Sequence, residues 1–294
     1  MMAAPSEGVT AQHLQSHGDI IARESPGDSV SCLAWLMISK EAIFQLQTQQ
    51  DTELGSHSAP IRYVSTLEDQ NLIVSGSWDK TLRFWSPQQP QPVNTVQLPD
   101  RVFAMDIKFP LMVVGLADRQ MLTFDLSQGG ASLQTPNSTI SSPLKMQTRT
   151  ICCFPSKAGY AVGGIEGRCS VKNLQDPSKT FSFKCHQTTT SAGSVNGCLN
   201  SLRKYLAVFC LDFHPVDTST LVTAGSDGAF IAWDTANKKC LRRCDASKTS
   251  ISACRFNAAG NLLAYAVSYD WSRGCEGFQD NLPKQVVIHR YKKQ

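Results

Sequence analysis

The stretch "GSWDKTLRFW" at residues 76–85 joins a tight polar turn to an alternating, strand-like run, and its aspartate, Asp79, precedes Trp85 by six residues. The same spacing recurs twice along the chain, from Asp118 to Phe124 and from Asp227 to Trp233. Each aspartate follows a glycine by two or three residues, and each glycine follows an apolar run of strand character. The repeated unit is therefore strand, turn and strand.

Weaker copies of this turn carry Glu166 and Asp270, so that successive turn acids lie about 40 to 60 residues apart. This period matches a β-propeller blade of about 40 to 45 residues with loop insertions. A further short strand, expected to be the innermost of its blade, lies upstream of most turns: 61–66, 102–109, 150–154, 210–215 and 251–257. The sequence predicts an all-β fold, a WD-repeat β-propeller with about five recognisable blades.

The turn acid has a physical role in such a blade. Its carboxylate can accept a hydrogen bond from a histidine in the incoming loop, while a strand hydroxyl and the indole N–H of the next strand complete the network. The best copy offers His57, Ser75, Asp79 and Trp85 for this network. Asp118, Asp227 and Trp233 stand at the corresponding positions of other copies. We expect these residues to be structural.

Composition favours a globular, intracellular protein. The 294 residues are 41% hydrophobic and 18% charged, and the net charge of +4 permits an acidic or nucleic-acid partner without requiring one. We find no apolar run of the roughly 20 residues that would cross a membrane, and no secretory signal. The eleven cysteines form no CxxC pair. We therefore expect no membrane association, metal or other cofactor.

The sequence also argues against an enzyme. It contains no recognisable nucleophile with its base, no glycine-rich phosphate loop and no metal-ligand cluster. Propellers present loops on a rigid disc and have no chemistry of their own. A binding scaffold is the expected class.

Several segments, in this order, resemble the RNA-export WD-repeat propeller family of the nuclear pore. They are "GSWDKTLRFW", "VQLPDRVFAMDI", "GGIEGRCSV", "FSFKCH", "VTAGSDGAFIAWD" and "ISACRFNAAGNLLAYAVSYDWSRG". The resemblance covers roughly residues 57–294. The "SYDWSRG" and "TFSFKCH" segments favour this family over the related mitotic-checkpoint propellers.

The resemblance implies a seven-bladed scaffold that binds a short acidic segment, the GLEBS motif, of an FG-repeat nucleoporin. It further implies a role in nuclear export of mRNA, association with messenger ribonucleoprotein or RNA, and location at the nucleus, the nuclear pore and the cytoplasm. The alternative is a mitotic-checkpoint or spindle-assembly scaffold without an RNA role.

The N-terminal part departs from the family pattern. We divide the chain into an irregular segment (1–24), a remnant of the first blades (25–56) and the propeller blades (57–294). "SPGDSVSCLAW" at 25–35 resembles a first inner strand, yet "SKEAIFQLQTQQ" at 39–50 already resembles the end of a second blade. We therefore expect a gap or a strained closure of the disc. "CLNSLRKYLAVF" (198–209) also interrupts the approach to the inner strand at 210–215.

Aromatic and basic residues in the turns are the candidate peptide-binding residues. Trp78 shares a turn with Lys80, and Trp271 shares another with Arg273, so that each pair offers an apolar surface beside a cation. Packing on a neighbouring blade is the competing interpretation of Trp78. The remaining candidates, for which a purely solvated or structural role is the alternative, are Arg168, Lys184 and His186.

Overall fold

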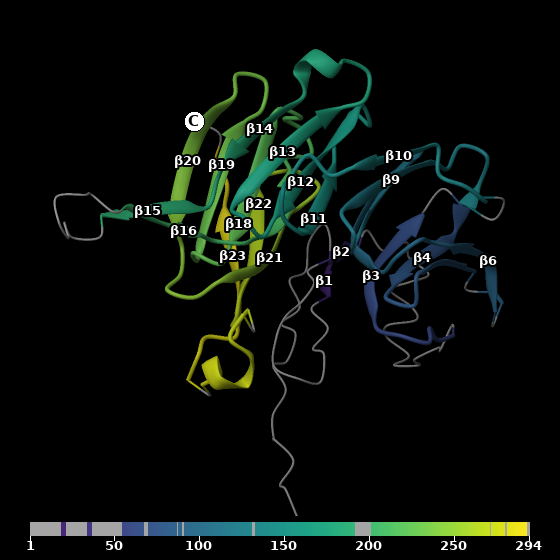
Figure 1. Ribbon diagram of the computed structural model, residues 1–294, viewed down its shortest axis with the longest axis horizontal. Helices are drawn as coiled ribbons and strands as arrows, with labels where there is room; N and C mark the ends of the chain where they lie inside the picture. The colour runs from purple at the N-terminus through teal and green to yellow at the C-terminus, as the bar shows by residue number, and fades with distance from the viewer. Residues whose placement is uncertain are drawn as a thin grey trace, which may run out of the picture.

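The computed structural model describes residues 19–21, 34–36, 55–67, 70–86, 88–89, 91–130, 133–191, 201–270, 272–279 and 281–292. Within these ranges the chain forms five antiparallel sheets of three or four strands and two smaller two-stranded sheets (Figure 1). The five larger sheets are the blades of a β-propeller, so the predicted fold class is confirmed.

Each blade runs from an inner strand outward in chain order. The first blade contains β3 (Ile61–Leu67), β4 (Leu72–Ser77), β5 (Thr81–Trp85) and β6 (Pro92–Gln97). The second contains β7 (Val102–Lys108), β8 (Leu111–Leu116), β9 (Gln120–Asp125) and β10 (Ser138–Ser141). The third contains β11 (Thr148–Cys153), β12 (Gly159–Gly164), β13 (Arg168–Asn173) and β14 (Phe181–Lys184). The fourth contains β17 (Val208–Phe213), β18 (Thr220–Gly225), β19 (Ala229–Asp234) and β20 (Lys239–Asp245). The fifth contains β21 (Ile251–Phe256), β22 (Leu262–Val267) and β23 (Gln285–Arg290).

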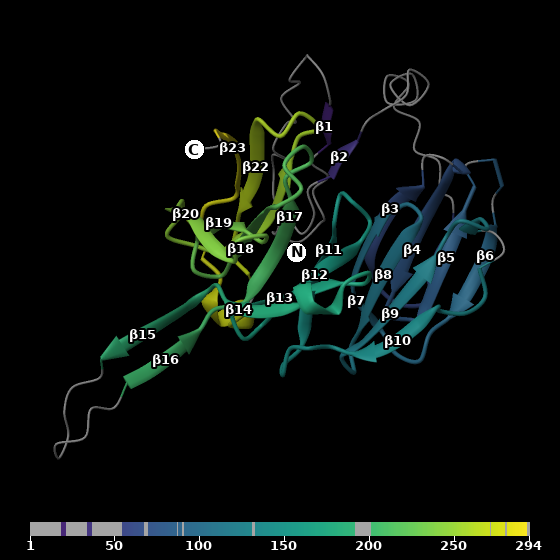
Figure 2. The same cartoon turned by 90° about the horizontal axis from the view of Figure 1, so that it is seen from above.

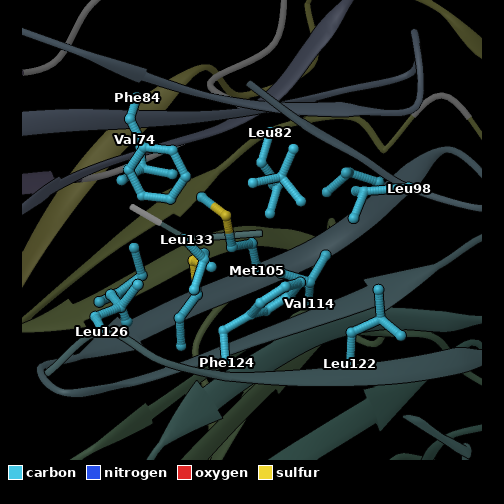
Figure 3. Close-up of a cluster of buried hydrophobic side chains, with 14 of the residues drawn as sticks. Val74, Leu82, Phe84, Leu98, Met105, Val114, Leu122, Phe124, Leu126 and Leu133 are labelled. Atoms are coloured by element: carbon cyan, nitrogen blue, oxygen red, sulfur yellow. The ribbon is translucent and has the colours of Figure 1, made fainter. Parts of the chain in front are cut away.

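Hydrophobic side chains fill the spaces between successive blades. Between the first two blades, Val74, Leu82 and Phe84 face Leu122 and Phe124, as Figure 3 shows. Similar clusters join the second blade to the third, the third to the fourth, and the fourth to the fifth. Because apolar burial is the main favourable term in folding, these clusters hold the described blades together as one row.

The two ends of this row differ. Inner-strand residues such as Met105 and Leu211 are buried, at 4% and 2% exposure, but Val64 in the first blade is 59% exposed. Its expected neighbour is a preceding blade, and the described residues contain none. At the other end, β2 (Ala34–Leu36), paired with β1 (Asp19–Ile21), lies beside β21. In the described part of the chain, β3 and β21 do not pack together as successive inner strands do.

A hairpin projects from the disc between the third and fourth blades. It is formed by β15 (Gln187–Ser191) and β16 (Ser201–Tyr205), which pair antiparallel, and Figures 1 and 2 both show it leading away from the blades. The predicted interruption at 198–209 overlaps this hairpin. The Leu206 backbone N–H donates to the His186 carbonyl oxygen at 3.0 Å, which closes the base of the hairpin.

Helical structure in the described residues is limited to short 3₁₀ turns such as η3 (Pro177–Lys179) and η4 (Gly274–Gly277). No helix among these residues is long and apolar enough to span a membrane.

Candidate functional site

The turns between the second and third strands of the blades lie on one face of the disc, which we call the entry face because the inner strands begin there. In all five described blades a backbone N–H of this turn donates to the carbonyl just before the inner strand. The pairs are Trp78 to Pro60, Ala117 to Arg101, Ile165 to Gln147, Ser226 to Ala207 and Ser268 to Ser250. These bonds fix each turn against the connection that enters its blade.

The first blade contains a connected polar network behind its turn. His57 Nδ1 lies 2.8 Å from an Asp79 carboxylate oxygen, and His57 Nε2 lies 2.7 Å from Ser75 Oγ. The Trp85 indole N–H donates to the same Ser75 Oγ at 2.7 Å. Because a carboxylate only accepts hydrogen bonds, Nδ1 is the donor to Asp79. The structure thus brings together the four residues that the sequence grouped.

The fourth blade has an equivalent network with a different histidine. His186 Nδ1 lies 2.7 Å from Asp227 Oδ1, and His186 Nε2 lies 2.9 Å from Thr223 Oγ1. The Trp233 indole N–H donates to Thr223 Oγ1 at 3.1 Å. His186 is fully buried. The sequence placed His186 among the peptide contacts, and this placement is corrected, because its two ring nitrogens are engaged inside the blade.

Both networks stabilise an ionised carboxylate. Burial by itself raises the pKa of Asp79, but hydrogen bonds from Thr81 and His57, together with the charge of His57, lower this pKa from 3.8 to about 2. Burial opposes ionisation of Asp227 too, and the hydrogen bond from His186 lowers its pKa. Arg243 contributes by donating to the second Asp227 oxygen at 2.9 Å. The turn acids are therefore held as charged acceptors.

The second blade lacks such a network around its turn acid. Asp118 is exposed, and its carboxylate accepts the backbone N–H of Gln120 at 3.0 Å, a bond local to the turn. Phe124, at the position of the tryptophan, is buried but has no N–H to donate. The grouping of Asp118 with the networked acids is corrected, because the short connection into this blade, "LPDR" at 98–101, offers no histidine.

Trp78 is half-exposed on the entry face, with 40% of its surface accessible. Its ring lies 6.1 Å from that of Phe103, the second residue of the next inner strand, so the turn also packs on a neighbouring blade. The Arg101 guanidinium lies 5.5 Å from the Phe103 ring centroid. Sequence reasoning missed Phe103 and Arg101, although both flank the start of a predicted inner strand.

Lys80 lies in the same turn as Trp78 and has a left-handed backbone with φ of 66°. Glycine takes the corresponding conformation in the third and fourth blades, at Gly167 and Gly228. The Lys80 ammonium lies 3.8 Å from Asp100, and about half of its side chain is exposed. Such an exposed pair contributes little to stability, so the ammonium remains accessible to a ligand.

Arg168 and Lys184 face each other across two strands of the third blade. They are register partners in the β13–β14 pair, close to the entry face. Arg168 is half-buried and Lys184 is exposed. Within the described residues neither forms an ion pair with a carboxylate. The structure therefore brings these two predicted cationic residues side by side on adjacent strands.

The long turn of the fifth blade contains the remaining candidates. Arg273 is exposed, and its backbone N–H donates to the Tyr269 hydroxyl at 3.1 Å. That hydroxyl donates to the Gly274 carbonyl oxygen at 3.0 Å, which fastens the turn. Trp271 lies outside the described residues. Trp78 and Arg273 belong to the first and fifth blades, at opposite ends of the row.

The described residues contain no group of three or more His, Cys, Asp or Glu side chains placed to bind a metal ion. Burial raises the pKa of the Cys152, Cys153 and Cys169 thiols well above 9.0, so their thiolates are disfavoured. The arrangement is suited to binding through exposed aromatic and cationic side chains on fixed turns.

The blade topology and the His–hydroxyl–Trp–Asp networks define a WD-repeat β-propeller. The family model of the WD domain, G-beta repeat, matches residues 48–86. Relatives match over most of the chain. The mRNA export factor GLE2 of Chaetomium thermophilum is 35% identical over 98% of this chain and 78% of its own length. The Poly(A)+ RNA export protein of Schizosaccharomyces pombe is 37% identical over 84% and 68%. Protein RAE1 of Arabidopsis thaliana is 42% identical over 97% and 88%. The chain belongs to this family of mRNA export WD-repeat propellers.

Proposed function

We propose that this protein is a non-enzymatic scaffold of the mRNA export machinery that binds a short acidic segment of a nucleoporin, of the GLEBS type, on its entry face. The observation that carries the proposal is the exposure of Trp78, a large aromatic side chain that is 40% accessible. Its turn is fixed by backbone hydrogen bonds to the chain segments that enter and leave the blade. Family membership supports the role in mRNA export.

Charge on the entry face supports an acidic ligand. Lys80 lies beside Trp78, Arg168 lies opposite Lys184, and Arg273 projects from the fifth blade. A tryptophan packed by a ligand supplies much of the affinity of an interface, whereas cations at its rim accelerate association and align the partner. A peptide that mixes apolar anchors with glutamates meets both requirements.

The partner in this proposal is an FG-repeat nucleoporin, and messenger ribonucleoprotein or RNA is the cargo that the complex accompanies. The corresponding location is the nucleus and nuclear pore, with passage to the cytoplasm.

The test is binding of an acidic GLEBS-type peptide to the wild type and to the variants Trp78→Ala, Trp271→Ala and Lys80→Glu, measured calorimetrically at low and moderate salt. Truncation of an anchoring tryptophan should cost about 1 to 3 kcal/mol of binding free energy. Charge reversal at Lys80 should weaken binding most at low salt, because salt screens exposed charges.

The matched controls are Leu241→Ala and Lys239→Glu on the outer strand β20. Both residues are exposed, and Lys239 follows the turn at the opposite face of the disc. The controls should bind like the wild type. If the Trp78, Trp271 and Lys80 variants fold and bind the peptide like the controls, the proposed site is wrong. If the wild type fails to bind, the proposed partner is wrong.

A further inference from the structure

A β-bulge recurs at the same place in all five described inner strands. The register of each inner strand with its neighbour skips one residue near the start of the strand. The skipped residues are Arg62, Phe103, Arg149, Phe209 and Ser252. All five are half-buried. A bulge leaves its extra residue unpaired and redirects its side chain, so the repeat places five such side chains around the entry-face end of the inner strands. We call them the bulge ring.

Arg149 connects several blades within the bulge ring. Its guanidinium lies 5.3 Å from the Phe209 ring centroid in the fourth blade. Its carbonyl oxygen accepts a hydrogen bond from the Tyr63 hydroxyl of the first blade at 3.4 Å. The Arg62 guanidinium lies over the ring of the same Tyr63, 5.0 Å from its centroid, so Tyr63 contacts both arginines. Burial, followed by the charge of Arg62, lowers the pKa of Arg149. The charge of Asp270 in the fifth blade raises the pKa of Arg149.

Among the described residues, no carboxylate forms an ion pair with the two arginines of the bulge ring, and the charge of Asp270 acts on Arg149 without such a pair. Arg255, Asp212 and Asp106 each lie three residues after a residue of the bulge ring. Arg255 lies 3.0 Å from Asp212 and 3.8 Å from Asp106, so at this level of the inner strands the arginine is paired with acids. In the described part of the chain, Arg62 and Arg149 form no ion pair with any carboxylate. Two like charges held close together favour an anion that binds between them.

We propose that Arg62 and Arg149 bind a carboxylate side chain of an acidic peptide at the centre of the entry face. This inference rests on the proposed function and names the residues that recognise the negative charge of the peptide. A guanidinium presents paired donors that match the geometry of a carboxylate. Both groups are already oriented by aromatic rings, Arg62 at 5.0 Å from the Tyr63 centroid and Arg149 over Phe209. Less side-chain freedom is therefore lost on binding.

The aromatic residues of the bulge ring favour a peptide over single-stranded nucleic acid. Bases bind such proteins by stacking on exposed aromatic faces. The Arg149 guanidinium lies over the Phe209 ring, and the Phe103 ring lies near both Arg101 and Trp78. Arginine thus occupies a face of each ring, which leaves the guanidinium groups as the recognition elements.

The experiment compares two probes: an acidic GLEBS-type peptide, and a copy in which glutamine replaces every glutamate. Calorimetry measures both against the wild type, Arg149→Gln, Arg62→Gln and Asp270→Asn. Arg149→Gln should weaken binding of the acidic peptide about tenfold or more and leave binding of the glutamine peptide almost unchanged. Arg62→Gln should act in the same direction. Asp270→Asn should strengthen binding of the acidic peptide severalfold, because it removes a negative charge that acts on Arg149.

Arg149→Lys is the second variant at the central position, and thermal melting checks that each variant folds. Lysine retains the charge but loses the paired donors, so affinity for the acidic peptide should fall between those of the wild type and Arg149→Gln. If Arg149→Gln does not fold, Arg62→Gln and Asp270→Asn decide the question.

The outcomes separate this inference from the proposed function. If the wild type binds the acidic peptide and Trp78→Ala weakens binding, but Arg62→Gln and Arg149→Gln bind both peptides like the wild type, the entry-face site stands and the carboxylate site is wrong. Equal affinity of the wild type for the two peptides also overturns the inference. A single-stranded RNA oligonucleotide is the third probe. Loss of RNA binding in the arginine variants, with peptide binding intact, would assign the bulge ring to nucleic acid and contradict the proposal.

Discussion

The first and second blades have the same spacing of an aspartate six residues before an aromatic residue, from Asp79 to Trp85 and from Asp118 to Phe124. Asp79 has a side chain only 4% exposed and accepts a hydrogen bond from His57. Asp118 is exposed and accepts a backbone N–H of its own turn. The spacing therefore predicts the turn in both blades, whereas the histidine in the incoming connection decides whether the acid becomes part of a buried network.

The fourth blade extends this comparison. His186 is 41 residues from Asp227, whereas His57 is 22 residues from Asp79, yet the two networks have similar geometry. The additional chain includes the β15–β16 hairpin, whose base is closed by the bond between Leu206 and His186. A blade thus tolerates an insertion between its histidine and its inner strand when a backbone hydrogen bond closes the base of the insertion.

The largest expected effect is at the networked acids. Asp79→Ala removes the acceptor of the His57 and Thr81 hydrogen bonds, and the free energy of unfolding should fall by about 1 to 3 kcal/mol. Asp227→Ala should act similarly. Denaturant unfolding measures both variants, and an unchanged midpoint for Asp79→Ala would show that the first-blade network does not stabilise the fold.

Acidification should reproduce part of this loss, because protonation leaves the side chain in place but removes its charge. The pKa of Asp79 is about 2 in the folded protein and 3.8 in the reference state. Since the folded value is lower, the stabilisation is fully present above about pH 4 and is lost as the pH falls toward 2. Unfolding of the wild type and of Asp79→Asn should be followed across this range. The variant should show the shallower dependence on pH, and parallel curves would contradict the assignment.

A smaller effect is expected from Trp85→Phe. Phenylalanine retains most of the apolar volume but cannot donate to Ser75 Oγ, so the free energy of unfolding should fall by about 1 kcal/mol. The reverse change in the second blade, Phe124→Trp, is the matched control. It should bring no gain, because that blade offers no acceptor network to the indole. A gain in thermal stability for Phe124→Trp would show that the second blade contains an acceptor after all.

The smallest effect is expected at Asp118. Asp118→Ala removes an exposed turn bond to Gln120, and the free energy of unfolding should change by less than about 0.5 kcal/mol. Measured beside Asp79→Ala under the same conditions, this variant tests the comparison directly. A loss at Asp118 as large as that at Asp79 would mean that the spacing alone, without the histidine, determines the contribution of the turn acid.

Much of the blade architecture could be predicted from local sequence. The turn acids, the glycines before them and the alternating runs around them lie within about ten residues of one another, as in the stretch at 76–85. Hydrogen bonds over such distances depend on spacing and residue type, both of which can be read directly. His57 lies 22 residues from Asp79, but it could be grouped with Ser75, Asp79 and Trp85 because it directly precedes the predicted inner strand at 61–66.

The sequence by itself therefore determined the repeating strand–turn–strand unit, the family and one complete network. Only the tertiary structure decided that His186 pairs with Asp227 and that Asp118 stays exposed. It also decided that Tyr63 contacts both Arg62 and Arg149 at the entry face. The physical reason is distance along the chain. Partners in different blades meet only because the inner strands pack side by side, and that packing depends on the hydrophobic clusters between blades rather than on any local spacing.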